Sequence, residues 1–113
     1  MLADAHRAAA EDIEAAIASL VASPRASRLI IEGAWGAAFH WIAYGCHSKH
    51  GKHQESHARL GTFLRSLGET STADNWERLD QVRQGGWYGS KTDPATQRAA
   101  LDILQEIHLW ATS

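Results

Sequence analysis

The chain has 113 residues, of which 44% are hydrophobic and 21% are charged, and its formal net charge at pH 7 is −2. This length suits a single domain over residues 1–113, and this composition excludes a disordered chain and bulk binding to DNA or to acidic membranes. The lone cysteine, Cys46, excludes an internal disulfide scaffold and a cysteine-rich zinc site.

Charged residues recur through the start of the chain and leave no early apolar stretch, so this segment does not resemble a signal peptide. The most apolar segment, residues 29–46, reaches the lower limit of about 18 residues for crossing a bilayer. It contains Glu32 and His40, however, and a carboxylate at the membrane centre costs roughly 3 kcal/mol. We therefore expect a buried helix, no membrane association and a cytoplasmic location, since an unpaired cysteine suits a reducing compartment.

Alanine is frequent along the chain and no segment alternates apolar and polar residues, which predicts helices and no strands. The first helix is expected over residues 3–22, with its apolar residues on one stripe. Ser23 can cap a second helix whose first position is Pro24, and this helix is expected to end near residue 48. Because the second helix is apolar nearly all round, we expect it at the centre of the fold.

Small residues give one stretch of the second helix a smooth surface. They are Gly33, Ala34, Gly36, Ala37 and Ala38. Such a surface allows another helix to approach closely. It equally suits a dimer seam, so both interpretations stay open.

Glycines mark the limits of the next two predicted helices. Gly51 predicts a break, and Gly68 predicts the end of a third helix over residues 54–67. A fourth helix is expected over residues 73–84, because the glycine pair 85–86 favours an end there.

An irregular segment is expected over residues 87–92, before the last helix. Asp93 is a suitable cap and Pro94 a suitable first residue for that helix. Five helices joined by short connections predict an all-α fold, a five-helix antiparallel up-and-down bundle.

Four histidines are concentrated in the connection after the second helix: His47, His50, His53 and His57. On a continuous helix their spacing would align the imidazoles as a metal site requires, but Gly51 interrupts that helix. We prefer a solvated polar connection, with a metal site as an alternative. A third interpretation is a nucleic-acid surface, because Lys49, Lys52 and Arg59 interleave with the histidines. His40 is expected to be a core residue with satisfied polar atoms.

Arg83 lies on the apolar face of the fourth helix, together with Trp76 and Leu79. A guanidinium in such a place needs a partner, and Asp80, three residues earlier, is the local candidate. The glycine pair 85–86 would let Tyr88 turn back toward Arg83, which lies about 140° away on a regular helix.

A guanidinium, a phenol and an indole together suit a phosphate and a stacked base. The candidate ligand-binding residues are therefore Arg83, Tyr88, Trp87, Lys91 and Asp80. The alternative is an ordinary helix end, with Arg83 paired to Asp80 and the aromatic residues in the core. No nucleophile triad, phosphate loop or paired-carboxylate motif is present, so no cofactor is expected and Cys46 is not a candidate nucleophile.

Three stretches together resemble the HEPN domains, small helical domains often found beside minimal nucleotidyltransferases. They are the small-residue and aromatic helix 33–40, the polar connection 49–53, and residues 79–88, which contain an Arg-x-x-small-x-Tyr pattern. The resemblance covers most of the chain from about Ser27. It implies a HEPN-like helical bundle that forms a homodimer.

Active HEPN ribonucleases use an Arg followed, after four to six residues, by a His. Arg83 matches the Arg, but the window for the His holds Tyr88, Gly89 and Ser90, and Tyr88 matches the Tyr of variant members. The resemblance therefore implies a nucleotide- or RNA-phosphate-binding domain, with a nucleotidyltransferase partner in a toxin–antitoxin-like system, and leans against an enzyme. The alternatives are a non-enzymatic helical interaction module and a residual metal-independent ribonuclease.

Overall fold

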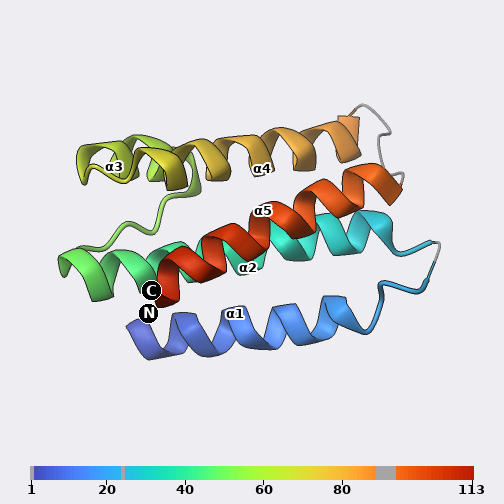
Figure 1. Ribbon diagram of the computed structural model, residues 1–113, viewed down its shortest axis with the longest axis horizontal. Coiled ribbons are helices and arrows are strands. Elements are labelled where there is room, and N and C mark those ends of the chain that lie inside the picture. The colour runs from blue at the N-terminus through green and yellow to red at the C-terminus, as the bar shows by residue number, and fades with distance from the viewer. Residues whose placement is uncertain (1, 24, 89–93) are drawn as a thin grey trace.

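The computed structural model describes residues 2–23, 25–88 and 94–113, with the backbone alone for residues 86–88. Within these ranges every regular element is a helix (Figure 1). The elements are α1 (Ala3–Ala18), α2 (Ser27–His50), the short 3-10 helix η1 (His57–Arg59), α3 (Leu60–Ser66), α4 (Thr70–Tyr88) and α5 (Pro94–Thr112). The predicted all-α class and the five predicted α-helices are confirmed for the part of the chain described.

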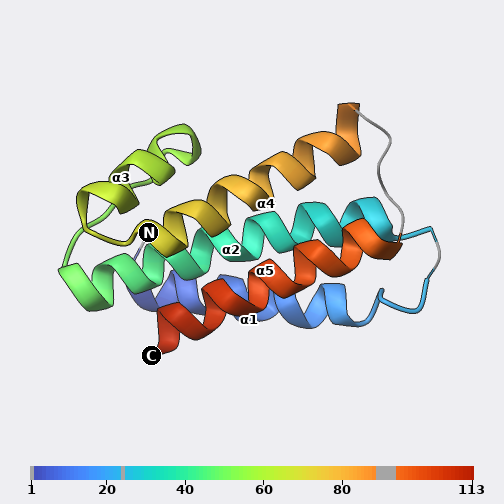
Figure 2. The same ribbon diagram turned by 45° about the horizontal axis from the view of Figure 1, so that its top comes forward.

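Helix α2 occupies the centre of the molecule, as its apolar composition predicts. It packs against α1, α4 and α5, while α3 packs against α4 (Figures 1 and 2). Its side chains Trp41, Ile30 and Ile42 are fully buried, and they meet Leu79 of α4 and Ile107 of α5 in one core. No helix in the described ranges has both the length and the apolar composition needed to cross a membrane.

The order of helix directions departs from a simple up-and-down bundle at one place. Helices α1 and α2 are antiparallel, and so are α3 and α4, and α4 and α5 (Figures 1 and 2). After α2, however, residues 51–56 run back along the molecule before α3 begins, so α2 and α3 point the same way. The expected strict alternation of directions is therefore interrupted between α2 and α3.

The smooth surface of α2 receives helices of the same chain. A Cβ atom at Gly33 would overlap Cγ2 of Ile17 in α1, and one at Gly45 would overlap the indole of Trp110 in α5. Close helix approach, the first of our two interpretations, explains these glycines. Gly33 gives no support to a dimer seam, because α1 already covers it.

Several predicted helix boundaries need correction in the first half of the chain. Helix α1 ends at Ala18 rather than residue 22, and α2 begins at Ser27 rather than at Pro24. The break at Gly51 is confirmed, because Gly51 caps α2 in the left-handed region at φ 63°. The third helix is shorter than predicted, because helical structure begins at His57 instead of residue 54.

The predicted end of the fourth helix is wrong. Helix α4 begins at Thr70 and continues through the glycine pair 85–86 to Tyr88, so residues 87 and 88 are helical rather than irregular. A glycine inside a helix costs only about 1 kcal/mol relative to alanine, which packing of α4 against α2 and α5 offsets. The start of α5 at Pro94 is confirmed, while residues 89–93, with the predicted cap Asp93, lie outside the described ranges.

Candidate functional site

Arg83 of α4 faces α2, where a carboxylate and an aromatic ring hold its guanidinium. Its Nε donates a hydrogen bond of 2.8 Å to Oε1 of Glu32. The guanidinium carbon lies 4.1 Å from the centroid of the Trp35 ring, within the range of a cation–π interaction. Asp80, the predicted partner, is the more distant of the two carboxylates, with 3.9 Å between Nη1 and Oδ1.

The two terminal nitrogens of Arg83 make no hydrogen bond to any residue in the described ranges, because its one such bond uses Nε. The side chain is 29% exposed, so the guanidinium borders solvent. A guanidinium has five N–H groups, of which four belong to the terminal nitrogens. Because the guanidinium is planar and held in one orientation, these four N–H groups can donate hydrogen bonds to an oxyanion.

Trp35 contacts both Arg83 and Asp80. Its Nε1 donates a hydrogen bond of 3.1 Å to Oδ1 of Asp80, and its ring stacks on Trp76 with 5.4 Å between centroids. Gln84 donates to the other oxygen of Asp80 at 2.8 Å. These contacts fix Asp80 and the ring on which Arg83 rests, so the site is built from α2 and α4 together.

Two open pockets flank this part of α4. One, of about 430 Å³, lies between α4 and the η1–α3 segment and includes His57, Thr62, Trp76 and Asp80 in its lining. The other, of about 500 Å³, lies between α4 and α5 and includes Arg78 and Gly85. Either pocket is large enough for a nucleotide-sized ligand.

The remaining residues of the predicted ligand site follow Arg83 along α4. Because α4 stays helical through Tyr88, the glycine break that would turn Tyr88 back toward Arg83 does not form. Position 87, four residues after Arg83, is the one that lies a helical turn beyond it. The side chains of Trp87 and Tyr88, and all of Lys91, lie outside the described part of the structure.

The four histidines of the predicted cluster, two in the last turn of α2 and two after it, do not form one metal site. His47 is exposed, and His50 donates a hydrogen bond of 3.1 Å to Glu69. His57 packs edge-on against Phe39, with 4.2 Å between the ring centroids. His53 turns toward α1 instead, because the connection after Gly51 is extended rather than helical.

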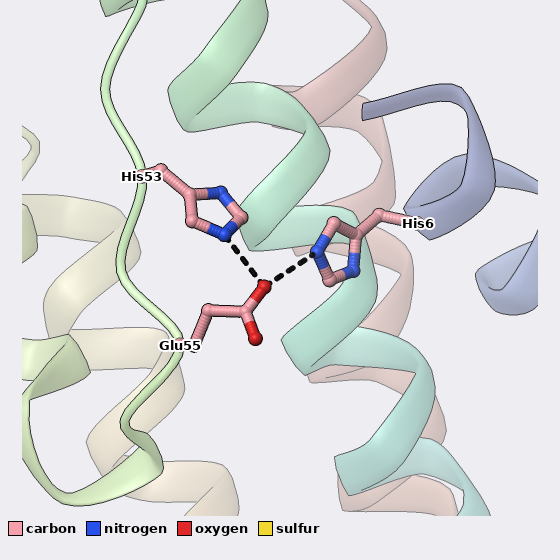
Figure 3. Close-up of side chains that lie close together, drawn as sticks. All are labelled: His6, His53 and Glu55. Carbon is pink, nitrogen blue, oxygen red and sulfur yellow. Dashed lines mark hydrogen bonds and ion pairs between the residues drawn. The ribbon is translucent and has the colours of Figure 1, made fainter. Parts of the chain in front are cut away.

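A different cluster joins His53 to a residue at the start of the chain (Figure 3). His53 Nε2 lies 2.6 Å from Oε1 of Glu55, and Nε2 of His6 lies 3.7 Å from the same oxygen. The Nδ1 atoms of His6 and His40 are 2.8 Å apart, so one donates a hydrogen bond to the other. The potential ligand atoms of His6, His53 and Glu55 all lie within 4.8 Å of one another.

Burial favours the neutral imidazole at two histidines here, His6 and His40. His6 is 2% exposed, and burial, together with the neighbouring His40, lowers its pKa. Burial and the nearby His57 lower the pKa of His40, which is half-buried rather than fully in the core. The hydrogen bond from His53 lowers the pKa of the Glu55 carboxyl.

Sequence reasoning missed this cluster because no local spacing signals it. His6 lies in α1 and His53 lies beyond the end of α2, so only the antiparallel packing of α1 on α2 brings them together. Glu32 was missed as the partner of Arg83 for the same reason, since 51 residues separate the two.

Cys46 is buried at 1% exposure in the core. Burial, with a smaller effect of the nearby Glu69 carboxylate, raises the pKa of its thiol to about 12. A reactive cysteine needs a lowered pKa, so this thiol has the opposite character from a nucleophile.

No protein-family model, curated protein or solved structure matches this chain.

Proposed function

We propose that this protein is a HEPN-like domain that binds a phosphate group of a nucleotide or of RNA at Arg83. The observation that supports this proposal best is the fixed orientation of the Arg83 guanidinium. Glu32 and Trp35 orient it, while its terminal nitrogens make no hydrogen bond to a residue that the structure describes and the side chain is 29% exposed. An oriented guanidinium can donate two parallel hydrogen bonds to a phosphate.

The surrounding charges set the expected strength of binding. Glu32 and Asp80 both lie next to Arg83, so the local field is not strongly positive. The net charge of −2 likewise gives little long-range attraction for a polyanion. We therefore expect modest affinity that depends on geometry and falls with added salt.

Binding, rather than cleavage, is the activity that we propose. The resemblance places Tyr88 where an active HEPN ribonuclease would have its His. A phenol with a pKa near 10 is a poor general base at pH 7 but can still donate a hydrogen bond to phosphate. In this proposal Trp87, Tyr88 and Lys91 add stacking, hydrogen-bonding and charge to the ligand site.

The proposal includes two copies of the chain per functional unit and a nucleotidyltransferase-type partner, as in toxin–antitoxin-like systems. Both features rest on the resemblance to HEPN domains. Analytical ultracentrifugation tests the first, with a mass twice that of the monomer as the expected result. If the protein is a monomer at micromolar concentration, the dimer is removed from the proposal, while the proposed phosphate site still stands.

The phosphate site is tested by binding of a fluorescently labelled single-stranded oligoribonucleotide, and of ATP, to the purified chain. Arg83→Ala should weaken binding about 10-fold or more, because it removes hydrogen bonds to a charged group. Arg83→Lys should fall between wild type and Arg83→Ala, since an ammonium keeps the charge but not the planar fork.

Arg78→Ala is the matched control, because it removes the same charge from an exposed position of the same helix. It also lines the pocket between α4 and α5. Unchanged binding in Arg78→Ala with a loss in Arg83→Ala supports the proposal. The reverse pattern would move the site to the α4–α5 pocket, and equal binding by folded Arg83→Ala and wild type would end the proposal.

A further inference from the structure

We propose that His6, His53 and Glu55 form a binding site for a divalent transition-metal ion of the zinc class (Figure 3). The site joins α1 to the extended segment that follows α2. It is separate from Arg83 in its residues and in its chemistry, and it does not depend on the function proposed above.

The ligand atoms suit this class of ion. Two imidazole nitrogens and one carboxylate oxygen are a common set in zinc sites that keep a fourth position for water or a ligand. Bonds of about 2.0 Å at a tetrahedral centre place ligand atoms about 3.3 Å apart. The 2.6 Å and 3.7 Å separations from Glu55 Oε1 to the two histidines lie on either side of that value.

The buried ring of His6 also supports a metal site. Its Nε2 is buried and has no hydrogen-bond partner in the described part of the chain, although it points toward Glu55 and His53 (Figure 3). A buried polar atom without a partner is costly, and in folded proteins such an atom commonly contacts a bound ion or a water molecule. A metal ion bound to Nε2 would satisfy this atom.

His40 contacts the other nitrogen of the His6 ring. When Nε2 of His6 binds a metal ion, the remaining proton of the ring lies on Nδ1. This Nδ1–H then donates to Nδ1 of His40, at the observed 2.8 Å. In most metal-bound histidines, a hydrogen bond from the ring nitrogen that does not bind the metal fixes the tautomer and the orientation of the ring.

The outer side of the site is open to solvent. The side chains of His53 and Glu55 are 41% and 55% exposed. An open pocket of about 430 Å³, lined by Leu2, Ala3, His47 and His53, adjoins the cluster. A metal ion can therefore enter, and water can complete its coordination. Binding replaces the proton through which His53 donates to Glu55.

The test uses untagged protein that has been stripped with a chelator and titrated with Zn²⁺, or with Co²⁺ as a coloured probe. We expect one ion per chain, visible d–d absorption of bound Co²⁺, and a rise in Tm with Zn²⁺. Failure to bind either ion at a one-to-one ratio would overturn the proposal.

Two exposed ligands give variants that should fold normally. His53→Ala and Glu55→Gln should each weaken Zn²⁺ binding more than 100-fold. Loss of a residue that only hydrogen-bonds a metal ligand costs about 10- to 100-fold, and loss of a ligand itself should cost more. His40→Phe removes the hydrogen-bond partner of His6 and should produce a loss of that smaller size. His47→Ala is the control, because His47 is exposed nearby and contributes no ligand.

The variants also decide between this site and random histidine binding. Wild-type affinity in both His53→Ala and Glu55→Gln would overturn the proposal, and so would an equal loss in His47→Ala. A loss confined to the His53, Glu55 and His40 variants would establish the site. Circular dichroism of each metal-free variant confirms that the fold is intact.

Discussion

Trp35 supports the guanidinium of Arg83 on its ring face, 4.1 Å away, while its indole nitrogen donates to Asp80. One side chain of α2 thus positions both a cation and an anion of α4. Asp80 and Arg83 lie three residues apart on one helix, so the contact also fixes the rotation of α4 against α2.

Trp35→Phe separates these two roles of the indole. Phenylalanine keeps an aromatic ring under Arg83 but removes the hydrogen bond to Asp80. We expect a loss of about 1 kcal/mol in the free energy of unfolding, measured by urea denaturation, and little change in phosphate affinity. Trp35→Leu removes the ring as well and should also lower the affinity. Equal affinity in the two variants would show that the ring plays no part in the site.

Asp80→Asn should strengthen phosphate binding. It removes a negative charge 3.9 Å from Arg83, while the amide oxygen can still accept from Trp35. A partly exposed ion pair contributes about 0.2–1 kcal/mol, which corresponds to a gain in affinity of roughly 1.5- to 5-fold. Equilibrium binding of the labelled oligoribonucleotide measures it. Weaker binding in this variant would count against Arg83 as the phosphate ligand.

Gly33→Ala and Gly36→Ala form a matched pair on α2. A Cβ at Gly33 would overlap the β-branched side chain of Ile17, so we expect destabilisation by about 1–2 kcal/mol. A Cβ at Gly36 would have its nearest neighbour, Ile13 Cδ1, at 3.9 Å, an ordinary contact. Gly36→Ala should therefore stabilise the fold by about 0.5–1 kcal/mol. Thermal and urea unfolding test both, and equal effects would contradict the close packing of α1 at Gly33.

Cys46 should stay unreactive in the folded protein at pH 8. Its thiol is buried and its pKa of about 12 leaves almost no thiolate at that pH. We expect Ellman's reagent to label it only after unfolding, with one thiol per chain in urea. Rapid labelling of the native protein would show that the core opens readily around the end of α2.

Strong local signals explain which parts of the fold could be predicted from the sequence. Pro94 predicts the start of α5, because proline suits the first turn of a helix and disrupts a later turn. Gly51 fixes the end of α2, because a residue in the left-handed region terminates the helix. The apolar surface of α2 predicts its central place without any knowledge of its neighbours.

The errors arise where packing outweighs local preference or where partners are distant in sequence. The glycine pair 85–86 favours a helix end, but α4 continues through it. Local spacing predicts Asp80 as the partner of Arg83, whereas the closer partner is Glu32 on another helix. The cluster of His6 and His53 depends on which helices lie side by side, and no residue spacing encodes that.

The attachment of α1 has a consequence for the order in which the molecule opens. Helix α1 packs chiefly on α2, whereas α2 is enclosed by α1, α4 and α5. A terminal helix with one main neighbour is held by fewer contacts than a central helix, and such an element commonly opens before global unfolding. We expect the amide hydrogens of α1 to exchange with solvent faster than those of α2. A bound ion at His6 would slow that exchange selectively, since it would connect α1 to the segment after α2.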